Sequence, residues 1–225
     1  MKVRYILFFI VLGLSFTACS LDNYDLPQES IQGKLIDKNG DAFISEQPNG
    51  YKIQLYEGDS PEKFTFWGKA DGTYKNTKIF KGTYSIQPIE GAFFPVEPKT
   101  LNIKGNSTVD FEVVPFLYIT ATIINSNRDV KATYRITQSP GAGKIKMARL
   151  LVSKWNPNVG MNYLDFETTR ALDGTSDTAI TGTDYIDYVR DILVSGVTYY
   201  ARVAVLAENT SGRYNFSSVS KIVVP

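Results

Sequence analysis

The fold is decided near the C-terminus by the stretch Leu193-Val194-Ser195-Gly196-Val197-Thr198-Tyr199-Tyr200-Ala201-Arg202-Val203-Ala204-Val205. Gly196 marks a turn, and strict alternation follows it. The pattern therefore predicts a half-buried strand whose core-facing residues are Tyr199, Ala201, Val203 and Val205. Residues 209–212, Asn-Thr-Ser-Gly, are typical of a hairpin loop, and residues 216–224 are predicted to form the last strand.

Alternation continues upstream of this hairpin. Leu117, Ile119, Ala121 and Ile123 share one predicted face, and less regular strands are expected over residues 131–137 and 145–154. Pro115 falls where this set of strands meets an earlier one. Residues 116–225 are therefore predicted to form one β-sandwich domain.

Residues 31–115 are predicted to form a second β-sandwich domain. About seven short strands are expected there, separated by turns such as Asn39-Gly40 and Asp71-Gly72. The 14 Tyr and 13 Phe residues of the chain also favour β-structure. The sequence thus predicts an all-β chain with two sandwiches in tandem, and no helix longer than about two turns.

Both predicted domains resemble known families. Gly33-Lys34-Leu35-Ile36-Asp37, Asp71-Gly72-Thr73-Tyr74 and Gly82-Thr83-Tyr84-Ser85-Ile86 resemble the carboxypeptidase regulatory-like, or transthyretin-like, fold. Residues 193–205 resemble the fibronectin type III pattern. That resemblance implies that Tyr199 is a corner tyrosine, whose hydroxyl bonds back to nearby backbone.

The N-terminus reads as an export signal. Residues 1–18 hold Lys2 and Arg4, then an apolar run too short to span a membrane. Phe16-Thr17-Ala18-Cys19 resembles a bacterial lipobox, which implies a lipid anchor on Cys19. The alternative is an ordinary secretory signal with a coincidental cysteine. Cys19 is the only cysteine in the chain, which favours the lipobox and leaves no disulfide.

Residues 19–30 are polar and acidic after the cysteine, which predicts a flexible tether. The acidic residues also resemble the surface-export signal of Bacteroidetes lipoproteins, although a plain linker explains them equally well. The whole order of parts resembles two-domain Bacteroidetes lipoproteins of unknown function associated with SusC/SusD-type glycan importers. That resemblance implies an outer-membrane lipoprotein exposed at the cell surface. A position facing the periplasm is the alternative.

Charge and composition narrow the function classes. Loss of Lys2 and Arg4 leaves 22 of 24 basic residues against 23 acidic ones, which argues against nucleic acid as a partner. The chain has no histidine, which removes Ser-His-Asp and Cys-His catalysis and histidine metal sites. We therefore expect no catalytic residues, no metal, no cofactor and no enzymatic activity.

Three weaker signals have plain alternatives. Asp37-Lys38-Asn39-Gly40-Asp41 spaces its oxygen ligands like a calcium loop, but the twelve-residue pattern is absent and a turn is favoured. Asp165 and Glu167 share a predicted strand face and are read as solvated carboxylates. Asp177-Thr178-Ala179, in an expected polar loop, resembles a bacterial O-glycosylation pattern, with coincidence favoured.

Ligand binding has better support than catalysis, because flat aromatic rings suit the apolar faces of sugars. The candidate platform residues are Trp155, Tyr163, Trp67 and Phe94, and the first two are preferred because asparagines lie near them in a loop. The alternative for each is packing. The sequence thus favours an accessory glycan-binding or scaffold lipoprotein of a polysaccharide-utilisation system, with a structural or adhesive protein such as a pilus component as the second hypothesis.

Overall fold

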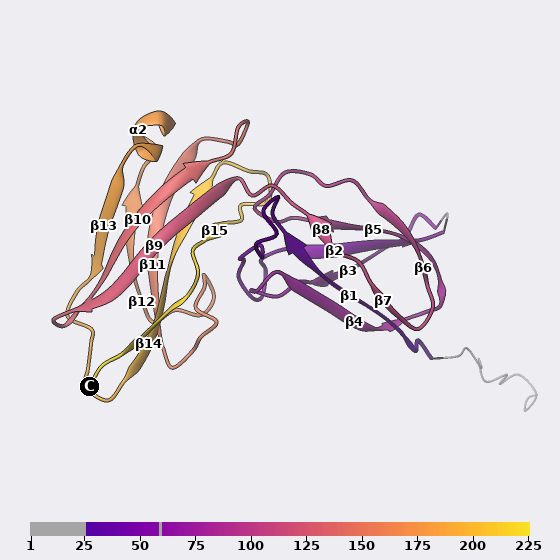
Figure 1. The fold of residues 1–225 in the computed structure, drawn as a ribbon, viewed down its shortest axis with the longest axis horizontal. Helices are drawn as coiled ribbons and strands as arrows, with labels where there is room; N and C mark the ends of the chain where they lie inside the picture. The colour runs from indigo at the N-terminus through magenta and orange to yellow at the C-terminus, as the bar shows by residue number, and fades with distance from the viewer. Residues whose placement is uncertain (1–25, 59) are drawn as a thin grey trace, which may run out of the picture.

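The computed structural model describes residues 26–58 and 60–225. The described chain is almost entirely β-structure, which confirms the predicted all-β fold, and its strands form two sandwiches placed end to end (Figure 1). We call them the N-terminal sandwich, residues 29–112, and the C-terminal sandwich, residues 117–223. In this part of the chain, no helix has the length and apolar character needed to cross a bilayer.

The N-terminal sandwich consists of two four-stranded sheets. In the first, β1 lies at the centre, antiparallel to β4 and parallel to β7 and β8. Its strands are β1 (Glu29–Ile36), β4 (Thr73–Ile79), β7 (Asn106–Thr108) and β8 (Phe111–Glu112). The second sheet is antiparallel in the order β3-β2-β5-β6 and contains β2 (Lys52–Glu57), β3 (Lys63–Trp67), β5 (Gly82–Ile89) and β6 (Lys99–Ile103).

The C-terminal sandwich is antiparallel throughout. One sheet has the order β13-β10-β9 and contains β9 (Leu117–Ser126), β10 (Asp129–Gln138) and β13 (Asp184–Val189). The other has the order β12-β11-β14-β15, with β16 also paired to β14. Its strands are β11 (Ile145–Lys154), β12 (Phe166–Ala171), β14 (Thr198–Ala207), β15 (Asn215–Phe216) and β16 (Ser220–Val223). A single turn of helix, α2 (Asp177–Thr181), connects β12 to β13.

Each sandwich has its own apolar core, built from the alternating residues of facing sheets. Ile31 and Leu35 of β1 pack with Ile53, Leu55 and Ile86 of the second sheet. In the C-terminal core, all four predicted inward residues of β14 are buried: Tyr199, Ala201, Val203 and Val205. The Tyr199 hydroxyl donates to the Ile192 carbonyl at 2.6 Å and accepts from the Val194 N–H at 3.2 Å, as the corner resemblance implied.

The structure differs from the predicted elements in several places. β1 begins at Glu29, two residues early, because the Ser30 N–H donates to the Gly105 carbonyl and its hydroxyl to Asn106. Residues 216–224 form no single strand, since residues 217–219 interrupt β15 and β16. Residues 177–179 are not in a loop: they begin α2, whose N-cap Ser176 accepts from the Ala179 N–H.

Candidate functional site

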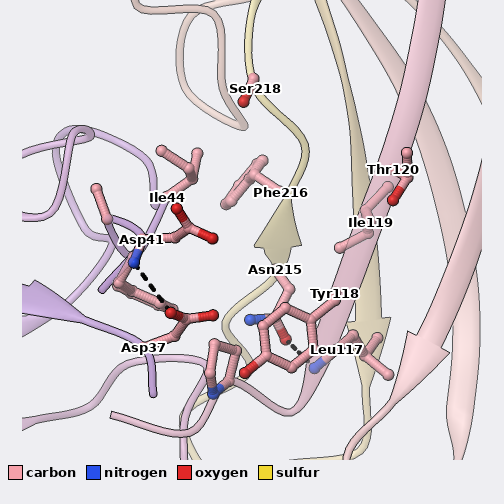
Figure 2. A pocket seen from close by; sticks show the side chains of 13 residues that line it. Asp37, Asp41, Ile44, Leu117, Tyr118, Ile119, Thr120, Asn215, Phe216 and Ser218 are labelled. Atoms are coloured by element: carbon pink, nitrogen blue, oxygen red, sulfur yellow. Dashed lines mark hydrogen bonds between the residues drawn. The ribbon is translucent and has the colours of Figure 1, made fainter. Parts of the chain in front are cut away.

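A hollow of about 410 Å³ lies where the two sandwiches meet (Figure 2). We call the contact region between the sandwiches the joint. One wall of the hollow comes from the turn after β1, and the facing wall comes from β9 and from β15 with the residues after it. The lining residues are Asp37, Asp41, Ala42, Phe43, Ile44, Pro115, Leu117, Tyr118, Ile119, Thr120, Asn215, Phe216 and Ser218.

The first wall is fixed by the turn that follows β1. Asp37 Oδ1 accepts the backbone N–H groups of Asn39 at 2.8 Å and Asp41 at 3.0 Å. Gly40 adopts φ +86°, which side chains disfavour. Asp37 is therefore held buried at the wall, while Asp41 stands exposed on the rim. The Asp37–Asp41 segment thus forms a turn closed by its own carboxylate. No group of three acidic or cysteine side chains suited to a metal occurs within residues 26–58 and 60–225.

Asn215 anchors the second wall and also connects the two sandwiches. Its Oδ1 accepts the Leu117 N–H at 3.1 Å, and its Nδ2 donates to the Ala92 carbonyl of the N-terminal sandwich at 2.8 Å. The neighbouring Phe216 ring carries the Arg202 guanidinium 3.9 Å from its centroid. The apolar lining is thus backed by a rigid polar network.

Tyr118 lies half-buried on β9, and Figure 2 shows it on the same wall as Asn215, with Asp37 on the facing wall. Burial and, secondarily, the Asp37 carboxylate raise the pKa of the Tyr118 hydroxyl. A tyrosine that keeps its proton remains a hydrogen-bond donor as well as an acceptor.

These groups suit reversible binding of a polyhydroxylated molecule. Two carboxylates accept hydrogen bonds, three hydroxyl groups both donate and accept them, and aromatic and aliphatic side chains supply apolar surface. Rings with apolar faces and polar rims, such as sugars, match such a lining. The hydroxyl groups belong to Tyr118, Thr120 and Ser218.

A buried pair of charges fixes the joint beside the hollow. Arg202 of β14 is 2% exposed and donates from Nη1 to the Ser45 carbonyl at 2.6 Å. Glu46 is 4% exposed and accepts the Met161 N–H at 2.8 Å. Gly160 permits this approach, because a Cβ there would lie only 3.0 Å from Arg202 Nη2 and 3.1 Å from Glu46 Oε2.

Burial sets the titration of both charged groups. It raises the pKa of the Glu46 carboxyl, although the Met161 N–H and the Arg202 charge oppose this shift. It lowers the pKa of the Arg202 guanidinium to about 10, against the attraction of Glu46. Both charges are thus costly to bury, and each depends on its partners across the joint.

The preferred platform residues, Trp155 and Tyr163, lie exposed on the segment that follows β11. Trp155 is 62% exposed, with φ +64°, and its backbone N–H donates to the Thr198 carbonyl. Tyr163 is 44% exposed and pairs its backbone with Gly160. Neither residue lines the joint hollow, and no ring contact connects the two among the described residues.

Trp67 and Phe94 also take different positions at the joint. The Trp67 ring, 38% exposed, is flanked by Lys52 Nζ at 4.8 Å and, from the other sandwich, by the Arg213 guanidinium at 5.4 Å. Phe94 meets Phe116 edge-on at 5.0 Å between ring centroids. The four predicted platform residues therefore do not lie together in one site.

The remaining sequence candidates have structural partners. Asp165 accepts from the Ser153 hydroxyl and the Lys154 N–H, and Glu167 pairs with Arg149. Thr178 is exposed in α2. Cys19 and the signal segment lie outside the described residues.

A second hollow of about 390 Å³ lies at the other end of the N-terminal sandwich. Its aromatic residues include Phe64, 47% exposed, and Phe80, 49% exposed. Unlike the joint hollow, it is lined by both acidic and basic side chains: Glu57, Glu62, Lys63 and Lys78. It provides a comparison site within the same chain.

Sequence reasoning missed most of the joint hollow. It identified the Asp37–Asp41 turn but treated it as a connection. Tyr118 and Thr120 were assigned to the face opposite the core, which is where the structure places them. The sequence signal that could have revealed these two residues was their polarity on that face. Nothing local indicates that Asp37, some 80 residues earlier, lies across from them.

Comparison with known proteins supports the fold. Residues 29–114 match the family described as the N-terminal domain of a protein of unknown function, DUF3823. A DUF3823 family protein from Bacteroides uniformis is 23% identical, with a TM-score of 0.78 over 88% of this chain and 100% of its own. A DUF3823 family protein from Parabacteroides merdae is 20% identical, with a TM-score of 0.70 and the same coverages.

A further Bacteroides uniformis structure, provisionally described as a carbohydrate binding protein, is also similar. It is 23% identical, with a TM-score of 0.73 over 88% of this chain and 100% of its own. Identities at this level show that the fold of both sandwiches is shared, and nothing more. No curated protein matches the chain.

Proposed function

We propose that this protein is a non-catalytic, lipid-anchored surface protein that binds oligosaccharide in the joint hollow. The observation that carries the proposal is the lining itself, where carboxylates and hydroxyl groups from both sandwiches surround apolar surface. The similar Bacteroides uniformis structure with a carbohydrate-binding description supports the same function class.

Affinity gel electrophoresis against a panel of polysaccharides tests the binding step. The probe is the chain from Ser20 onward, which retains every described strand and both cores. Retardation by a glycan is expected, and the affinity is expected to fall about two- to tenfold in Tyr118→Ala and in Thr120→Ala, because each removes a hydroxyl from the hollow. Phe80→Ala in the second hollow and Trp155→Ala are the matched controls. If these controls alone abolish retardation, the site lies elsewhere.

The anchor is tested separately on the full chain in cells. Metabolic labelling with a radioactive fatty acid is expected to mark the wild type and not Cys19→Ser. Protease treatment of intact cells then distinguishes surface exposure, where the labelled protein is digested, from a periplasmic location, where it is protected.

The proposed partners are the importer proteins of a polysaccharide-utilisation system. Cross-linking in the native membrane followed by capture through this chain tests that part. Capture without any importer component, together with no retardation by any glycan, would favour the structural or adhesive alternative.

A further inference from the structure

We propose that the joint hollow selects its glycan by charge, accepting neutral or amine-bearing sugars and rejecting sugars that carry carboxylate or sulfate groups. This inference rests on the proposed glycan-binding function and adds the ligand class. It follows from the kinds of charge that line the hollow and from how firmly they are held.

The formal charges of the lining are all of one sign. Of its thirteen residues, Asp37 and Asp41 are acidic and none is lysine or arginine. An anionic ligand in this hollow would therefore face two carboxylates without a cation to pair with. Recognition of anionic sugars in proteins depends on arginine or lysine, and above all on bidentate arginine.

Asp37 is held in place and does not swing away from an approaching anion. Two backbone N–H groups of its own turn bind Oδ1, and the Asn39 amide donates to Oδ2 at 3.2 Å. The side chain is 6% exposed, so its charge acts in partly desolvated surroundings, where screening is weaker than in water. A ligand anion beside it is opposed by an unrelieved like charge.

Two cations that neighbour lining residues, Lys38 and Arg202, do not enter the lining. Lys38 belongs to the same turn but is exposed and outside the lining. Arg202 lies against the Phe216 ring, donates to the Ser45 carbonyl, and has the buried Glu46 carboxylate as its charge partner. The second hollow, with both signs of charge, lacks this bias.

The test compares matched neutral and anionic polymers. Soluble β-1,4-linked glucan, galactan and mannan are each used in native form and after oxidation of their primary hydroxyls to carboxylates. Affinity electrophoresis of the chain from Ser20 gives a dissociation constant for each. The oxidised form of the bound polymer is expected to bind the wild type roughly tenfold more weakly, with the difference shrinking as salt is raised.

A charge-neutral variant provides the control. Asp37→Asn with Asp41→Asn keeps a side-chain oxygen to accept the turn hydrogen bonds, and circular dichroism verifies its fold. In this variant the two polymer forms are expected to bind within about twofold of each other.

The outcomes separate the two proposals. If the wild type binds the oxidised polymer as tightly as the native one, while Tyr118→Ala still weakens native binding, charge selection is wrong and the proposed function stands. If no polymer binds, or Tyr118→Ala leaves binding unchanged, the proposed function fails and charge selection fails with it.

Discussion

β14 contributes to two buried regions of opposite character. On one face, Tyr199, Ala201, Val203 and Val205 enter the apolar C-terminal core. On the other face, Arg202 and Ala204 enter the joint, where Arg202 meets Ser45 and Phe216. One strand thus lies between a large apolar interior and an interior in which buried charges and hydrogen bonds accompany a smaller apolar cluster.

The two regions differ in the substitutions that they tolerate. An apolar core tolerates changes that conserve volume, because dispersion and burial are not directional. The joint depends on Glu46, Arg202 and Asn215, whose partners lie at fixed positions on the other sandwich. We therefore expect substitutions at the joint to be more damaging and more sensitive to pH than those in the core.

The largest effect is expected for Arg202→Met. This change removes the charged donor of the buried Ser45 carbonyl and one of the positive charges that stabilise the Glu46 carboxylate, which costs about 1.5–3 kcal/mol of unfolding free energy. Urea denaturation measures the loss. Combining it with Glu46→Gln is expected to recover part of the stability, since the buried side chain then carries no charge. If Arg202→Met left the unfolding free energy unchanged, the joint would contribute little to the stability of the fold.

In the core, a smaller loss is expected from removing the hydroxyl of the corner tyrosine. Tyr199→Phe keeps the ring but removes the hydroxyl that binds Ile192 and Val194, at a cost of about 1–2 kcal/mol. Tyr200→Phe, on the half-buried opposite face of β14, is the matched control and should cost under about 0.5 kcal/mol. Equal losses for both variants would contradict the corner assignment.

A pH dependence is expected from Glu46 and not from the core. Burial raises the pKa of this carboxyl in the folded protein above its unfolded value of about 4.3, so its ionisation opposes folding. The wild type should therefore lose stability relative to Glu46→Gln as pH rises from about 4 through the folded pKa. Urea midpoints of both proteins from pH 4 to pH 8 measure this difference. If the difference between the two urea midpoints stayed constant over this pH range, folding would not shift the pKa of the Glu46 carboxyl.

The smallest effect on stability is expected in the hollow. Asp41→Asn changes an exposed rim residue and should alter the unfolding free energy by less than about 0.5 kcal/mol. Thermal unfolding measures it beside the glycan-binding assay. A large loss of stability would mean that the rim belongs to the structural part of the joint.

Local patterns predicted the strands well where alternation was strict. The residues of β14 were assigned to the correct faces, because burial on one side imposes a period of two. No bounds were predicted for β12 or β13, although Asp165 and Glu167 were placed on a strand face. β12 reads Phe-Glu-Thr-Thr-Arg-Ala, and its register is set by pairing with β11 and not by an apolar stripe.

The joint could not be predicted for a different reason. Arg202 and Glu46 are 156 positions apart, and a charged residue in a strand ordinarily indicates a solvated face. Their burial depends on how the two sandwiches are placed, which no local pattern encodes. The four candidate aromatic residues also lie apart, since Trp67 and Phe94 have partners at the joint while Trp155 and Tyr163 face solvent.

The central position of β1 has a mechanical consequence. Its first residue lies at the end of the N-terminal sandwich remote from the joint, and its last residue reaches the joint (Figure 1). Tension between the N-terminus and a polymer held at the joint would run along the strand. β1 has β4 on one side and β7 and β8 on the other, and their hydrogen bonds lie mainly across that direction. They would be loaded in shear and would have to break together, so β1, about 26 Å long, would resist extension between its first residue and the joint.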